Sequence, residues 1–93
     1  MQSVHLSKHA LARAAQRGFP VELLHFVARH GDVRKPARYG RRAVFLSDHK
    51  ADLLAEQGFS PEFLTSALGL CVVLVNRSVV TCHDGRDMQR SFV

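Results

Sequence analysis

Hydrophobic side chains recur at helical spacing near the start of the chain. Between residues 8 and 17, Leu11, Ala14 and Ala15 would share one face of a helix, and polar side chains would share the other. Ser7 is a good N-cap residue, because its hydroxyl can accept a hydrogen bond from the first helical turn. The pattern therefore predicts a helix that begins after Ser7.

A second helix follows after a very short link. Gly18 suits the left-handed residue that ends a helix, and Pro20 suits the first position of the next one. Apolar residues repeat at intervals of three and four through residues 20–30, and Gly31 then interrupts the pattern. We expect residues 1–31 to form a pair of packed helices.

The middle of the chain contains two segments with different residue patterns. Residues 32–46 read as a basic loop that leads into an apolar strand at Ala43–Leu46. In residues 47–69, Ser47 and Ser60 each precede a short helical pattern that ends at a glycine. This segment is expected to be a helical insertion.

The last regular pattern is a β-hairpin. Two runs rich in β-branched residues flank Asn76-Arg77, which suits a two-residue turn. Regular pairing from that turn would place Cys71 opposite Cys82, and we expect both to be reduced and buried. Cys82 and His83 are neighbours on a strand and point to opposite faces, so we expect neither a metal site nor a cofactor.

These elements together predict an α+β fold in a single domain, residues 1–93. The helical pair would pack on a small antiparallel sheet of three to four strands, interrupted by the inserted helices. Residues 70–93 would supply the hairpin and a basic tail.

Composition adds a candidate partner. The net charge is +5, but residues 1–46 hold nine basic and two acidic side chains, whereas residues 47–93 hold four and six. Ten of the 13 cations are arginine, whose planar fork matches phosphate oxygens. We therefore expect contact with nucleic acid. No apolar run reaches the length of a membrane span and no secretory signal is recognisable, so we expect a cytoplasmic protein without a membrane partner.

One set of side chains has the chemistry for RNA cleavage without a metal. His9, Arg13 and Arg17 are spaced four apart on one helix stripe, and His83 ends the last strand. Histidine can move protons near neutral pH, and arginine can stabilise charge on a phosphoryl group. We expect His9, Arg13 and His83 to be catalytic. The side chains expected to bind nucleic acid are Arg17, Arg34, Lys35, Arg38, Tyr39, Arg41, Arg42 and Arg86.

The opening of the chain resembles that of a family of small bacterial proteins of unknown function, in the run Ser7-Lys8-His9-Ala10-Leu11-x-Arg13-x-x-Gln16-Arg17-Gly18-Phe19. The closing strands, at residues 72–75 and 79–82, are similar too. That family is similar to RelE-like toxins and other ribonucleases of the barnase–EndoU–colicin group. The resemblance implies an RNA-cleaving toxin, or an inactive relative, with a small antitoxin as its protein partner. His9, Arg13 and Arg17 match the motif, whereas His83 matches by position alone.

Two other interpretations remain open at this point. The basic helix stripe is also typical of a solvated face without catalytic function. Both faces of the hairpin are apolar and an edge strand would be available for pairing, which fits a toxin-like interaction protein without activity. The spacing of Ala14, Gly18 and Leu24 also fits a helix-turn-helix, which would make residues 20–30 a DNA recognition helix.

Overall fold

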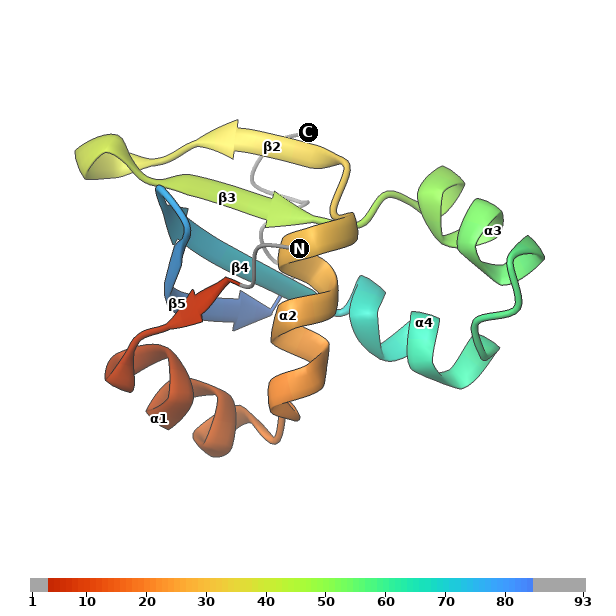
Figure 1. Ribbon diagram of the computed structural model, residues 1–93, viewed down its shortest axis with the longest axis horizontal. Helices are drawn as coiled ribbons and strands as arrows, with labels where there is room; N and C mark the ends of the chain where they lie inside the picture. The colour runs from red at the N-terminus through yellow and green to blue at the C-terminus, as the bar shows by residue number, and fades with distance from the viewer. Residues whose placement is uncertain (1–3, 85–93) are drawn as a thin grey trace.

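The computed structural model describes residues 4–84, which form four helices and a five-stranded sheet (Figure 1). The elements are β1 (His5–Leu6), α1 (Lys8–Arg17), α2 (Val21–His30), β2 (Val33–Pro36), the 3-10 turn η1 (Arg38–Gly40), β3 (Arg42–Phe45), α3 (Asp48–Glu56), α4 (Pro61–Leu68), β4 (Leu70–Val75) and β5 (Ser78–Asp84). The predicted α+β class, with the first two helices packed on a sheet, is confirmed. Within residues 4–84, no helix has the length and apolar character needed to cross a lipid bilayer.

The sheet is larger than the sequence predicted, and it is mixed. Its strand order is β1-β5-β4-β3-β2, with β1 parallel to β5 and the other neighbours antiparallel. The expected three to four antiparallel strands omit β1, which is only two residues long, and β2, which lies in the segment expected to be a basic loop. In β2 the half-buried Val33 and Lys35 alternate with the exposed Arg34 and Pro36, so its period of two is hidden by polar residues.

The predicted helix caps are confirmed. The hydroxyls of Ser7, Ser47 and Ser60 each accept a hydrogen bond from the backbone N–H three residues later, at 3.0 to 3.1 Å. Gly18 ends α1 in the left-handed conformation, with φ of 73°. The Ser7 hydroxyl also donates to the carbonyl of Val80 at 3.1 Å, so this one side chain ties the start of α1 to β5.

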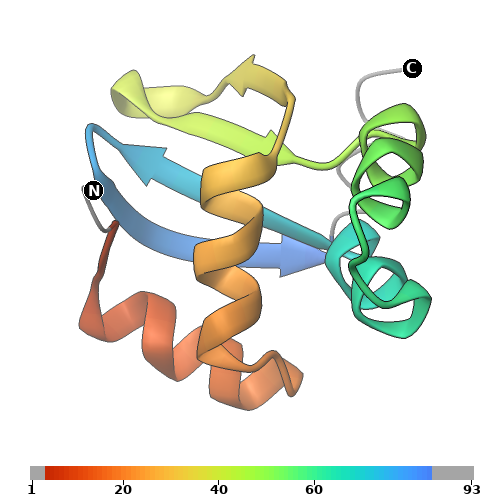
Figure 2. The ribbon, with the colours of Figure 1, turned by 45° about the vertical axis from the view of Figure 1, so that its right-hand side comes forward.

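The helices cover one face of the sheet (Figures 1 and 2). In Figure 2, α2 crosses that face, while α3 and α4 lie together at one end of the sheet. Leu23, Leu24 and Val27 of α2 are buried there against Val44 and Val72. Hydrogen bonds also tie the residue before β2 to the N-cap of α3. The Asp32 carboxylate accepts from both the backbone N–H and the hydroxyl of Ser47, at 2.8 and 2.6 Å.

The predicted buried face of α1 is wrong, because the helix is rotated about its axis relative to the prediction. Ala10 and Ala14 are the buried residues, whereas Leu11 is 41% exposed and Ala15 is exposed. The small Ala10 and Ala14 side chains let α1 lie close to β5. Arg13 borders this face of the helix and is half-buried.

The predicted pairing of the two cysteines is also wrong. The turn at Asn76-Arg77 is confirmed, and Val75 pairs with Ser78 as expected. Beyond Val79, however, the register shifts by one at a β-bulge, with Val80 as the extra residue. Cys71 therefore lies opposite His83, and Cys82 lies opposite Val72 on the helix-covered face. Both cysteines are free and buried, as expected.

The opposite face of the sheet carries a small cluster of its own. Ala43, Phe45 and Cys71 are buried there, with the half-buried Val33 packed against them. None of the four described helices lies on this face (Figure 1). His83 and Thr81 of β5 share this face, because Cys71 pairs with His83 and Val73 pairs with Thr81.

Candidate nucleic-acid interface

His83 lies in a hollow on the sheet face that the described helices leave uncovered. The bulge at Val80 directs His83 to this face, where the side chain is half-buried. The hollow has a volume of about 220 Å³. It is lined by Ala37, Arg38, Tyr39, Arg41, Ala43, Val73, Thr81 and His83. The structure thus brings the predicted catalytic His83 together with three of the predicted nucleic-acid-binding residues.

The loop between β2 and β3 supplies the basic wall of this hollow. The Ala37 N–H donates to the Arg41 carbonyl at 2.8 Å and closes the loop. Tyr39 and Gly40, at its tip, have positive φ values of 61° and 71°. The Arg41 guanidinium lies 6.0 Å from the centroid of the Tyr39 ring, which is 87% exposed. An exposed aromatic ring beside arginines is an arrangement suited to stacking an unpaired base and holding its phosphates.

The environment of His83 keeps its imidazole neutral. Burial lowers the pKa of His83 below its usual 6.5, and the charges of Arg13 and Arg17 lower it further. Both arginines belong to α1 and neither lines the hollow. A neutral imidazole is the form of histidine that accepts a proton.

We expect the charge-neutralising substitution Arg13→Gln to raise the pKa of His83. The substitution removes one of the two positive charges that disfavour the imidazolium, so the protonated form becomes easier to reach. A titration of the His83 ring proton by NMR would measure this shift. In the wild type, the same depressed pKa makes the unfolded chain take up the proton first, so the free energy of unfolding should fall as the pH drops through and below 6.5.

Arg29→Gln is a matched control for this titration. Burial lowers the pKa of His30, and the charges of Arg29 and Lys50 lower it further. Removing the Arg29 charge should raise the pKa of His30 and leave that of His83 where it was. If Arg13→Gln left the His83 titration unchanged, the placement of Arg13 beside His83 would be wrong.

Other predicted site residues are not gathered at this hollow. His9 is exposed in the first turn of α1 and does not line the hollow. Lys35 shares the His83 face of the sheet, whereas Arg34 and Arg42 project from the helix-covered face. Arg86 lies outside the described residues.

The cysteines are unsuited to nucleophilic chemistry. Burial raises the pKa of the Cys71 thiol to about 11, and it also raises that of Cys82. A thiol with a raised pKa holds its proton at neutral pH and is a poor nucleophile. Among residues 4–84, no group of three or more His, Cys, Asp and Glu side chains is placed to hold a metal ion.

Of the polar residues that line the hollow, sequence reasoning missed one, Thr81. Thr81 is 7% exposed and lies two residues before His83 on the same face. The alternation Thr81-Cys82-His83 was a readable signal, since a strand places every second residue on one face. The bulge, which decides which face that is, left no mark in the local pattern of β-branched residues.

No protein-family model matches the sequence, and neither the curated proteins nor the solved structures give a match.

Proposed function

We propose that this protein is an RNA-binding ribonuclease of the toxin type, which cleaves RNA in the His83 hollow without a metal. The observation that supports the proposal best is the gathering of His83, Arg38, Tyr39 and Arg41 around one hollow, with the charges of Arg13 and Arg17 acting on it. The resemblance of the opening motif to RelE-like toxins points the same way. In that setting a small antitoxin protein would neutralise the activity.

His83 is the proposed general base. Its neutral imidazole takes the proton from a ribose 2′-hydroxyl, and the resulting oxygen attacks the adjacent phosphorus. A bond forms from the 2′-oxygen to phosphorus as the bond from phosphorus to the 5′-oxygen breaks. The leaving 5′-oxygen takes a proton from water. The products are a 2′,3′-cyclic phosphate end and a 5′-hydroxyl end.

The arginines and the tyrosine serve binding and charge stabilisation. Guanidinium groups form charge-assisted hydrogen bonds with phosphoryl oxygens, and these bonds strengthen as negative charge develops there. Tyr39 is exposed at the loop tip, where its ring can stack on a base. Because the hollow is small, we expect it to accept unpaired RNA in preference to a duplex.

The proposal is tested by incubating the full chain with total RNA in the presence of EDTA and sequencing the new ends. We expect cleavage that leaves 2′,3′-cyclic phosphates. The substitution His83→Asn should slow cleavage by about a hundredfold or more, the usual contribution of a general base. His49→Asn is the matched control, because His49 is exposed on α3, outside the hollow, and should cleave at the wild-type rate.

The outcomes divide clearly. RNA that stays intact with the wild-type protein overturns the proposed activity. Cleavage that survives His83→Asn overturns the assignment of the base, and His9→Asn in parallel would show whether the other predicted catalytic histidine carries it. Retained RNA binding with loss of cleavage in His83→Asn supports the proposal.

An interaction module is the second candidate function, and one observation favours it. A groove of about 680 Å³ lies between α2 and the segment that joins α3 to α4. Phe26, Phe59 and Phe63 line it, and the Phe26 ring meets the other two edge-on at centroid distances of 5.2 and 4.8 Å. These three rings are half-buried and pack against the main hydrophobic cluster, and aromatic rings that line a groove are typical of a surface that buries an apolar side chain. A protein partner that binds the wild type but not Phe63→Ser, with no RNA cleavage by either, would favour this function.

A further inference from the structure

A second hollow lies on the helix-covered face of the sheet, opposite the face that carries His83. Its volume is about 180 Å³, and it is lined by Arg34, Gly40, Arg42, Leu74 and Asn76. It takes no part in the proposed cleavage, because the strand alternation directs its two arginines away from the face that carries His83.

The register of the sheet places the two arginines on the same face, where both line the hollow. Arg34 pairs with Val44 on β3, and Arg42 lies two residues before Val44 on that strand. The two arginines are therefore diagonal neighbours on one face, within reach of each other's long side chains. Arg42 in turn pairs with Leu74, and Asn76 follows two residues later at the β4–β5 turn, with φ of 54°.

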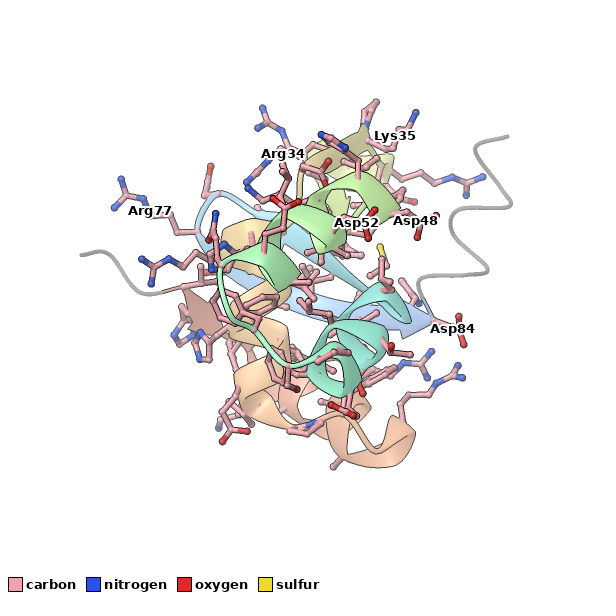
Figure 3. All side chains as sticks on the ribbon, turned by 90° about the vertical axis from the view of Figure 1, so that its right-hand side faces the viewer. Arg34, Lys35, Asp48, Asp52, Arg77 and Asp84 are labelled. Atoms are coloured by element: carbon pink, nitrogen blue, oxygen red, sulfur yellow. The ribbon has the colours of Figure 1, made fainter. Side chains whose placement is uncertain are left out.

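Arg34 and Arg42 are neighbouring cations, and no carboxylate lines the hollow to offset their repulsion. Like charges at cross-strand neighbours repel each other, and none of the residues that line this hollow is acidic. In Figure 3, Asp48, Asp52 and Asp84 lie to the right of Arg34 and Arg77, on the same side as Lys35. An anion between Arg34 and Arg42 would turn the repulsion into attraction.

We propose that this hollow binds one phosphate group as its dianion, such as inorganic phosphate or the terminal phosphate of a nucleotide chain. Two guanidinium forks can each give paired hydrogen bonds to phosphate oxygens, and the Asn76 side-chain amide adds an uncharged donor. The hollow has room for a single tetrahedral group. A terminal phosphate carries more negative charge than an internal diester, so it gains more from two cations.

The site is tested by titrating the full chain with inorganic phosphate at low ionic strength, followed by calorimetry and by backbone amide shifts in NMR. We expect binding with shifts around Gly40 and Asn76. Arg34→Gln and Arg42→Gln should each weaken the affinity at least about tenfold, as expected for loss of a charge-assisted pair. Arg77→Gln is the matched control, because Arg77 is exposed at the neighbouring turn and does not line the hollow. Its affinity should stay within about twofold of the wild type.

Two further binding measurements identify the source of the phosphate. A short RNA with a 5′-phosphate should bind more tightly than the same RNA with a 5′-hydroxyl, and Arg42→Gln should remove the difference. Equal binding of the two RNAs, with inorganic phosphate still bound, would support free phosphate as the ligand. Absence of phosphate binding, or binding that persists in both arginine variants, would overturn the site.

The test of the phosphate site is independent of the test of the proposed ribonuclease activity. His83→Asn should leave phosphate binding at this hollow unchanged, since His83 lies on the opposite face of the sheet. A protein that cleaves no RNA would still bind phosphate here if the hollow has the assigned role.

Discussion

Replacing Gly31 by alanine is expected to lower the free energy of unfolding by about 3 kcal/mol. Gly31 is buried where α2 ends and the chain enters β2. A β-carbon built there would lie 2.5 Å from Cγ1 of Val44 and 2.7 Å from the carbonyl oxygen of Val27. The backbone φ of −58° is ordinary, so the cost comes from overlap with neighbouring atoms. The Val27 carbonyl also accepts the Gly31 N–H at 2.8 Å, which prevents it from moving aside.

Thermal and denaturant unfolding would measure this loss. For a domain of this size, it corresponds to a drop in Tm of about 15 °C. Gly69→Ala is the matched control, because Gly69 also ends a helix, α4, and its added methyl group would meet nothing closer than 3.5 Å. We expect Gly69→Ala to change stability by less than about 0.5 kcal/mol. A Gly31→Ala protein as stable as that control would mean that α2 does not approach β3 as closely as described.

The substitution Ala14→Glu is expected to lower the free energy of unfolding by about 4 kcal/mol or more, a large share of the stability of a small domain. Ala14 is 1% exposed and belongs to the main hydrophobic cluster. A carboxylate at this position would have to leave water, or force α1 away from β5. Circular dichroism and urea unfolding would report the loss.

Ala15→Glu is the control that isolates burial as the cause. It introduces the same side chain into the same helix one residue later, at an exposed position. Helix propensity and net charge change equally in the two variants, so the difference between them measures burial. We expect Ala15→Glu to stay within about 0.5 kcal/mol of the wild type. Equal losses in both variants would favour the helix face predicted from the sequence, with Ala14 and Ala15 both packed inward.

Local features were predictable from the sequence. The serine caps, the left-handed Gly18 and the Asn76-Arg77 turn each depend on a few neighbouring residues, so the pattern of the chain contains the necessary information. The helical insertion was found for the same reason. The α+β class followed from the order of these elements.

Features that depend on distant residues were not predictable. β1 is a strand only because Ser78 and Val79 lie beside it, and two residues carry no period of their own. The bulge at Val80 coincides with the hydrogen bond from the Ser7 hydroxyl, and this contact spans 73 residues. The candidate site shares this dependence, since the bulge decides that His83 faces Arg38 and Arg41 in place of Cys82. Arg34 and Arg42 lie on the opposite face of the sheet from His83, Arg38 and Arg41. This could not be predicted because residues 33–36 were expected to form a loop and instead form strand β2.

The parallel pairing of β1 with β5 has a consequence for the order in which the protein forms. β1 can pair only after β5 has been made, and the bond from the Ser7 hydroxyl to the Val80 carbonyl, 73 residues later, can form only then. Bringing together segments so far apart costs loop entropy before any contact repays it. We therefore expect closure of this sheet edge to be a late and slow step of folding. Helix α1 would stay without its β5 support until residues 78–84 have been synthesised.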